Sequence, residues 1–157
     1  MSADNSYPRA SARTRRFTLG EPRSVTICAG GSRLLFLRAM AGDDPRTGLW
    51  SVDLPDGEER LVVDPTATAD AELPPQERAR RERARETASG VVAYSADEAG
   101  RVAVYAAGGA LHVVDVDSGD IRVLAAAGPY DPRIDPTGER LLAWPNEPPP
   151  AMVAPRA

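Results

Sequence analysis

Residues 90–124, GVVAYSADEAGRVAVYAAGGALHVVDVDSGDIRVL, constrain the fold more than any other part of the chain. The stretch contains four short apolar runs, rich in valine, separated by segments of Gly, Asp and Ser that suit tight turns. The runs cover residues 90–95, 101–106, 110–116 and 120–124. This pattern predicts a four-stranded antiparallel unit. Such a unit leaves an apolar face uncovered, so it is stable only when it stacks on another unit.

A hairpin of the same design lies upstream. Residues 49–62, LWSVDLPDGEERLV, align without a gap on residues 111–124, LHVVDVDSGDIRVL. The alignment matches Gly57 with Gly119, so the turn and its two strands recur at the same offsets. The sequence therefore predicts that one hairpin occurs twice.

A second repeat marks the strand before each hairpin. Three segments place a Gly shortly before an Arg that is followed by four apolar residues: GGSRLLFL (30–37), AGRVAVY (99–105) and GERLLAW (138–144). Arg33, Arg101 and Arg140 are therefore expected to share one position in the repeat. The step between the last two arginines is about the length of a four-stranded propeller blade.

These repeats predict an all-β fold. We expect an incomplete β-propeller over residues 17–144, with about two four-stranded antiparallel blades and the start of a third. Strands at 17–19 and 24–28 are expected to lead into the first blade. Residues 1–16 are polar and carry arginines, which predicts a mobile N-terminal arm. Residues 145–157, PNEPPPAMVAPRA, predict a disordered Pro-rich tail that cannot complete a third blade.

One helix is expected as an insertion, over about residues 74–89, PPQERARRERARETAS. Paired prolines suit its first turn, and opposite charges lie at i, i+4 spacing. Its apolar residues are alanines, which predicts a surface helix because a core helix needs larger side chains. Its arginines alternate with glutamates and no aromatic side chain offers a stacking surface, so a nucleic-acid interface is not expected.

The composition excludes several functional classes. The net charge of −4 over 157 residues disfavours binding to nucleic acids and anionic membranes, which requires a basic excess. No apolar run approaches the roughly 20 residues that span a bilayer. All basic residues are arginine, which excludes a Schiff-base or P-loop lysine. The only cysteine, Cys28, is expected to be buried. With no signal peptide recognised, we expect a cytoplasmic chain.

Four pieces of the chain together resemble the N-terminal β-propeller of the dipeptidyl-peptidase IV branch of the prolyl oligopeptidase (S9) serine peptidases, in its bacterial form. They are the arginine-started strands, the two hairpins, the arm ELPPQERARRERARETASGVVAYS and the segment DPRIDPTGERLLA. The arm is the most telling piece, since bacterial members carry an RRER-type helix that runs into a Gly-Val or Gly-Ile strand. In DPRIDPTG, Asp135 and Thr137 replace the Ser and Asp of the family's Ser-Pro-Asp-Gly pattern.

The resemblance covers roughly residues 17–144, the opening part of the family's length. It implies a propeller that caps an α/β-hydrolase domain, which removes dipeptides from peptide N-termini. The partners would then be that domain and peptide substrates. No G-x-S-x-G nucleophile motif occurs, and Glu58–Glu59 lies in a hairpin turn, so neither the nucleophile nor the family's amine-binding glutamates can be assigned. We therefore expect no catalysis by this chain alone and no cofactor.

Two residue groups are candidate sites. His112 is the only histidine, and the alignment puts it in the position of Trp50 on a strand, which favours a packing or surface role over catalysis. Asp115, Asp117 and Asp120 resemble half of a calcium loop, but Gly occupies a ligand position and no Glu closes the loop. We assign no catalytic, cofactor-binding or metal residue.

The Gly pairs are not expected to bind phosphate. Gly30–Gly31 and Gly108–Gly109 are followed by predicted strands, whereas a phosphate loop is followed by a helix. Both pairs are therefore interpreted as hairpin glycines.

An alternative function is a stand-alone propeller-like interaction module that closes by oligomerisation. An open arc of blades leaves an edge strand and an apolar face uncovered, which predicts self-association or aggregation of the purified chain. The coding DNA beyond Ala157 would separate the two functions: further blades and a G-x-S-x-G motif would support the peptidase fragment, and their absence would favour the module.

Overall fold

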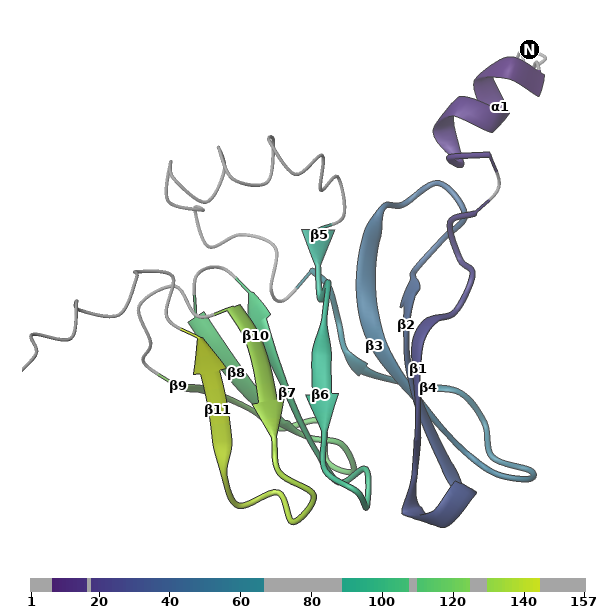
Figure 1. Cartoon of the computed structure of the whole chain (residues 1–157). Helices are drawn as coiled ribbons and strands as arrows, with labels where there is room; N and C mark the ends of the chain where they lie inside the picture. Colours follow the sequence, from purple (N-terminus) through teal and green to yellow (C-terminus); the bar gives the residue numbers. More distant parts are fainter. Residues whose placement is uncertain (1–6, 17, 67–88, 108–109, 125–129, 145–157) are drawn as a thin grey trace, which may run out of the picture.

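The computed structural model describes residues 7–16, 18–66, 89–107, 110–124 and 130–144. These residues form three antiparallel sheets that follow one another along the chain and lie side by side as an open arc (Figure 1). The prediction of an all-β, incomplete propeller-like fold is confirmed, and the sheets do not close into a barrel.

Each sheet is a meander in which consecutive strands pair. The first sheet contains β1 (Arg23–Cys28), β2 (Arg33–Ala39), β3 (Arg46–Asp53) and β4 (Arg60–Val63). The second contains β6 (Tyr94–Ala96), β7 (Val102–Ala107), β8 (Ala110–Asp115) and β9 (Ile121–Leu124). The third unit is the hairpin of β10 (Tyr130–Ile134) and β11 (Leu141–Trp144). β10 packs on β6 and β7, so the third unit continues the stack.

The predicted repeat of the hairpin is confirmed by its register. Trp50 pairs with Leu61 as His112 pairs with Val123, and Ser51 pairs with Arg60 as Val113 pairs with Arg122. The turns match as well, because the N–H of Gly57 donates to the Asp53 carbonyl at 2.7 Å and the N–H of Gly119 to the Asp115 carbonyl at 2.8 Å. The β3–β4 ladder differs from β8–β9 by a register shift between Leu49 and Trp50.

The prediction that Arg33, Arg101 and Arg140 share one position is wrong for Arg101. In the ladders, Arg33 lies opposite Asp53, whereas the residue opposite Asp115 is Val102. The reason is the distance from the preceding turn. Arg101 directly follows its turn glycine, while one residue separates Arg33 and Arg140 from theirs. The turn sets the register of the strand that follows it, so in the second sheet the position equivalent to Arg33 is occupied by Val102.

The predicted single strand at 90–95 is also wrong. Gly90 belongs to β5 (Ser89–Gly90), which pairs in parallel with β3 of the first sheet, and the second sheet begins only at Tyr94. The equivalent places in the other units are bulges, where Ser24 and Asp131 adopt φ of 52° and 47°. Each unit therefore interrupts its first strand at the same point.

One backbone hydrogen bond joins successive units in the same way. The Ala29 N–H donates to the Glu98 carbonyl at 2.8 Å, and the Glu98 N–H donates to the Pro136 carbonyl at 3.0 Å. These three residues lie in the turns 28–31, 97–100 and 135–138, each of which ends in a glycine with φ between 63° and 99°. The same turn thus connects the first unit to the second and the second to the third.

The core lies between the first and second sheets and draws on both. Its buried hydrophobic members are Cys28, Leu35, Leu37, Leu49, Val62, Val63, Val91, Ala103, Tyr105, Ala107, Val114 and Val116. The expected burial of Cys28 is confirmed, at 3% exposure. Burial between the sheets, at about 25 cal/mol per Å² of apolar surface, is what stabilises the stack.

The N-terminal segment differs from the expectation. A helix, α1 (Tyr7–Arg13), lies within the predicted arm, and none of its residues is buried. The strand expected at 17–19 is not formed by Thr18 and Leu19, which lie in a turn. The predicted helix at 74–89 (apart from Ser89) and the Pro-rich tail at 145–157 lie outside the described residues. No helix within the described ranges is long and apolar enough to cross a membrane.

Candidate functional site: the cavity between the second sheet and the third unit

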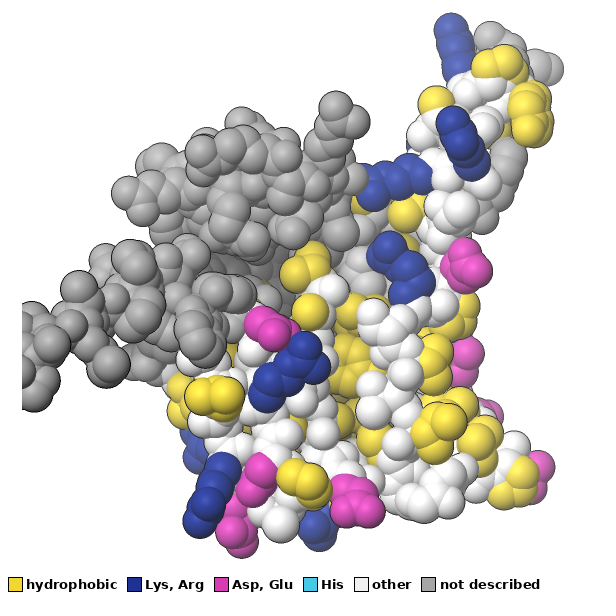
Figure 2. Space-filling view, in the orientation of Figure 1, with side chains coloured by type: hydrophobic (Ala, Val, Ile, Leu, Met, Phe, Trp, Pro, Cys, Tyr) yellow, Lys and Arg dark blue, Asp and Glu magenta, His cyan; other side chains and the backbone are white. Residues whose placement is uncertain are grey.

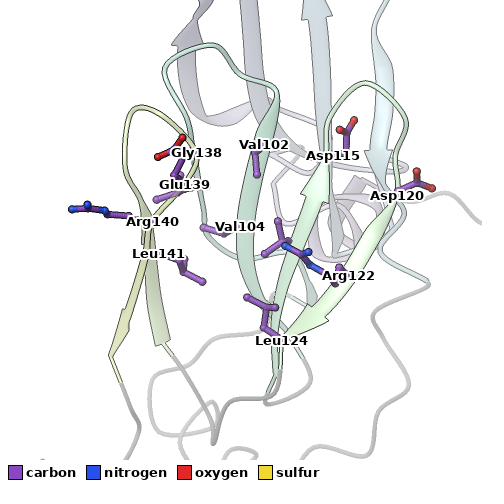
Figure 3. A pocket seen from close by; sticks show the side chains of 12 residues that line it. Val102, Val104, Asp115, Asp120, Arg122, Leu124, Gly138, Glu139, Arg140 and Leu141 are labelled. Atoms are coloured by element: carbon purple, nitrogen blue, oxygen red, sulfur yellow. The ribbon is translucent and has the colours of Figure 1, made fainter.

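A hollow with a volume of about 400 Å³ lies between the second sheet and the β10–β11 hairpin. Figure 3 shows Val104 of β7 and Leu141 of β11 on its opposite walls, with Leu124 of β9 nearby. Its lining residues are Val102, Val104, Val113, Asp115, Asp120, Arg122, Leu124, Ile134, Gly138, Glu139, Arg140 and Leu141. Half of the lining residues are apolar side chains of strands, and the charged ones come from β8, β9 and the turns.

The cavity exists because the third unit has two described strands where the second sheet has four. β10 covers the part of the second sheet formed by β6 and β7. Over β8 and β9, no described strand of the third unit is present. The face of β8–β9 that points away from the first sheet is therefore covered by no described strand of the third unit, and Val113 on this face is only half-buried, although Leu111 beside it is buried.

The turns at the rim of the cavity are held by aspartate side chains. Oδ1 of Asp135 accepts hydrogen bonds from the N–H groups of Glu139 and Arg140, at 2.9 and 3.1 Å. The hydrogen bond from the Arg140 N–H is the main reason that the pKa of Asp135 is lowered. Oδ1 of Asp97 makes the equivalent pair of bonds, at 2.7 and 2.9 Å, in the second unit. The rim is thus built by the same turn chemistry as the rest of the arc.

At the joint between the first and second sheets, Tyr94 of the second sheet reaches the first. The hydroxyl oxygen of Tyr94 lies 2.7 Å from the Leu35 carbonyl oxygen, 2.8 Å from that of Ser24 and 2.9 Å from Oγ1 of Thr26. All three partners belong to the first sheet. Burial raises the pKa of Tyr94 to about 12. One side chain of the second sheet therefore binds β1 and β2 of the first.

Arg33 makes further contacts across this joint. Its Nε lies 2.6 Å from Oδ1 of Asp53, and its Nη1 lies 2.8 Å from Oδ1 of Asp117 and 3.1 Å from the Gly100 carbonyl oxygen. Asp53 belongs to the first sheet, whereas Asp117 and Gly100 belong to turns of the second. The hydrogen bond from Arg33 lowers the pKa of Asp53. Arg60 adds a hydrogen bond of 2.8 Å to the Asp117 carbonyl.

The structure places His112 on β8, facing the first sheet. Its ring stacks on Tyr105 with 4.9 Å between the centroids and an interplanar angle of 7°. Nε2 lies 3.1 Å from the Ala107 carbonyl oxygen, and Nδ1 is buried with no hydrogen-bond partner in the described part of the chain. His112 therefore lies in the sheet stack and does not line the cavity.

The acidic residues of the half calcium loop each have other partners. Oδ1 of Asp115 accepts hydrogen bonds from the N–H groups of Asp117 and Ser118, and the bond from Ser118 is the main reason that the pKa of Asp115 is lowered. Oδ2 of Asp120 accepts a hydrogen bond from Oγ of Ser118 at 2.9 Å. Asp117 pairs with Arg33. Within the ranges that the structure describes, no three His, Cys, Asp or Glu side chains form a group suited to a metal ion.

The other sequence candidates lie apart from the cavity. Glu59 pairs with Arg38 at 2.6 Å, and the Arg38 guanidinium lies 4.3 Å from the centre of the Trp50 ring. Gly30–Gly31 are part of the turn that follows β1, as predicted. Gly108–Gly109 lie outside the described residues.

Two structural residues are not evident from the sequence patterns above. Asp97 is 2% exposed and holds the turn of the second unit, and Tyr94 bonds the neighbouring sheet. A sequence signal for Asp97 exists, because DEAG at 97–100 and DPTG at 135–138 share an Asp three residues before a Gly. No comparable signal marks Tyr94, whose partners are set by how the sheets stack.

Comparison with known proteins identifies similarity of fold. No family model matches the chain. Among solved structures, it is similar to a chain from a structural and mechanistic study of two prolyl endopeptidases, with a TM-score of 0.55 and 18% sequence identity. The match covers 92% of this chain and 20% of that one, so this chain spans about a fifth of the neighbour's length. The fold of this chain is thus a propeller-like arc similar to part of a prolyl endopeptidase.

Proposed function

We propose that the chain is the opening part of the β-propeller of an S9-type serine peptidase of the dipeptidyl-peptidase IV branch. Its role in the whole protein is to form part of the cap that limits access of peptides to the hydrolase domain. It has no catalytic activity alone. The observation that carries this proposal is the backbone bond repeated from unit to unit, together with the fold similarity to a prolyl endopeptidase over 92% of the chain.

The residues that the structure describes support a scaffold role. The polar contacts of Tyr94 and Arg33 join one sheet to the next. The single imidazole, on His112, stacks on Tyr105. Partners of the chain are then the hydrolase domain and its peptide substrates, in the cytoplasm.

The coding sequence beyond Ala157 tests this proposal. We expect further units with the Asp-x-x-Gly turn, followed by a G-x-S-x-G motif. The purified chain should show no turnover of a chromogenic dipeptide-proline substrate above a buffer control. Turnover that His112→Ala abolishes would contradict the proposal, and so would a coding region without further blades or a nucleophile motif.

A stand-alone module that closes by self-association is the second candidate. It is favoured by two side chains on the outer face of β1, Val25 and Ile27, which are 55% and 70% exposed. Hydrophobic side chains are visible at the surface on the side of the first sheet (Figure 2). Sedimentation equilibrium distinguishes the two: a defined oligomer that Ile27→Asp dissociates would favour the module.

A further inference from the structure

We propose that the cavity beside β11 is an acceptor site for a β-hairpin of the kind that this chain already contains twice. The hairpin would pair along β11 and place alternate apolar side chains against β8 and β9. This inference deepens the proposed function, since a continued propeller would supply such a hairpin. It rests on the geometry of the repeat.

The first step of the argument is the free edge of β11. In both complete sheets, the second strand pairs on both sides: β2 with β1 and β3, and β7 with β6 and β8. β11 is the equivalent second strand, because Leu141 pairs with Ile134 as Ala103 pairs with Ala96. Among the described residues, β11 has only β10 as a partner. Its other edge presents backbone N–H and C=O groups that an added strand would satisfy.

The second step is the shape of the hollow. The walls at Val113 and Leu124 belong to the face of the second sheet that points away from the first. The equivalent face of the first sheet is covered more completely. Leu49 and its equivalent Leu111 are both buried, but Ser51 is 3% exposed whereas Val113, at the matching place on β8, is only half-buried. The joint between the first and second sheets thus shows what covers such a face: the third and fourth strands of the next unit.

The third step names the side chains that enter the hollow. On β8, His112 and Val114 face the preceding sheet, and Val114 is fully buried there. On β3, the residues at these places are Trp50 and Val52 by the alignment. The first strand of the bound hairpin is therefore expected to carry a ring side chain and, two residues later, a side chain the size of valine. Both side chains lie on the same face of that strand, the face toward the second sheet.

The fourth step assigns a role to Arg122. Its equivalent in the first sheet, Arg60, donates to the Asp117 carbonyl in the hairpin turn of the next unit at 2.8 Å. Arg122 lines the cavity at the matching place on β9. It is thus expected to donate to a carbonyl in the turn of the bound hairpin, and to fix how far the hairpin slides along β11.

A peptide binding experiment with the full chain tests the proposal. The probe is a synthetic peptide of residues 110–124, the chain's own β8–β9 hairpin, with a scrambled peptide as control. Titration followed by backbone amide NMR should show saturable one-to-one binding, with shifts at 141–143 and in β8–β9. Val113→Asp should weaken binding by about tenfold or more, which corresponds to about 1.4 kcal/mol. Arg122→Gln should weaken it severalfold, and Ile27→Asp, on the outer face of the first sheet, should not change it.

An insertion variant covers the case in which the free peptide stays unfolded. A copy of residues 107–124 is inserted after Trp144, so that the connector and hairpin follow β11 as they follow β7. The insertion should raise the melting temperature by several degrees, because about 1 kcal/mol corresponds to about 2–8 °C in domains of this size. A control insertion carries Asp at the copied positions of His112 and Val114, and should lack the increase.

The outcomes separate this inference from the peptidase proposal. No peptide binding together with an unchanged melting temperature of the insertion variant would overturn the acceptor site, even if the coding sequence continues with blades. NMR shifts confined to β1, or binding that Val113→Asp leaves intact, would also overturn it. Binding as expected, with no hydrolase encoded downstream, would support the acceptor site and contradict the peptidase proposal.

Discussion

The two joints of the arc are built on the same backbone contact but differ in their side chains. At the first joint, between the first and second sheets, the bond from Ala29 to Glu98 is accompanied by Tyr94, Arg33 and a continuous buried core. At the second joint, the bond from Glu98 to Pro136 is accompanied by a hydrogen bond from the Ile134 N–H to Oγ of Ser95 and by a cavity.

The difference shows which part of a repeat is fixed and which part varies. The turn geometry recurs in every unit because it depends on a few backbone angles and a glycine. The stability of each joint depends instead on the side chains that happen to face one another. We therefore expect substitutions at the first joint to cost much more than matched substitutions at the second.

The largest contrast is expected between two leucines. Leu49→Ala empties a fully buried position at the first joint and should lower the free energy of unfolding by about 3 kcal/mol. Leu141→Ala, on the cavity wall at the second joint, removes a half-buried side chain and should cost about 1 kcal/mol. Urea denaturation followed by circular dichroism measures both. Equal costs would mean that the buried core does not lie between these sheets.

Two tyrosines give the next contrast. Tyr94→Phe removes a hydroxyl that contacts three groups of the first sheet, and should cost about 2 kcal/mol. Tyr105→Phe removes a buried hydroxyl with no partner in the described part of the chain, and should be neutral or stabilising. Thermal unfolding of the two variants compares them directly. A destabilising Tyr105→Phe would show that this hydroxyl has a partner after all.

Alkaline pH should weaken the first joint through the same tyrosines. Burial raises the pKa of Tyr94 and of Tyr105 to about 12, whereas an unfolded tyrosine titrates near 10. The contribution is therefore fully present below pH 10 and is lost as the pH rises from 10 to 12. After allowance for solvent screening we expect a loss of about 1–2 kcal/mol. Denaturation at pH 9 and pH 11.5 measures it, and Tyr105→Phe should reduce it.

The smallest contrast concerns two arginines in equivalent positions. Arg33→Met removes the contacts to Asp53 and Asp117 and should cost about 1 kcal/mol, because both carboxylates are more than half exposed. Arg140→Met, at the same place in the third unit, should cost less than about 0.5 kcal/mol. In 1 M NaCl the cost of Arg33→Met should fall. A salt-independent cost would mean that Arg33 acts by packing.

The positions of strands and turns could be predicted from the sequence because both signals are local. The valine-rich runs between glycine-containing turns gave β7, β8 and β9 to within about a residue or two at each end, and the aligned hairpins gave the repeat. For the candidate site, the sequence predicted only that the third unit is incomplete, and it did not predict the cavity or its lining residues. Its walls come from strands whose facing side chains are fixed by stacking.

The sequence by itself determined that this chain is a series of β-meanders with a recurrent turn, since alternating apolar residues and glycines specify strands and turns within a few residues. Only the tertiary structure decided that Val102, and not Arg101, occupies the position equivalent to Arg33. It also decided that residues 90–95 are divided between the first and second sheets, and that Tyr94 and Asp117 bond these two sheets together. The physical reason is that register is counted from each turn, whereas contacts between sheets depend on how whole sheets stack.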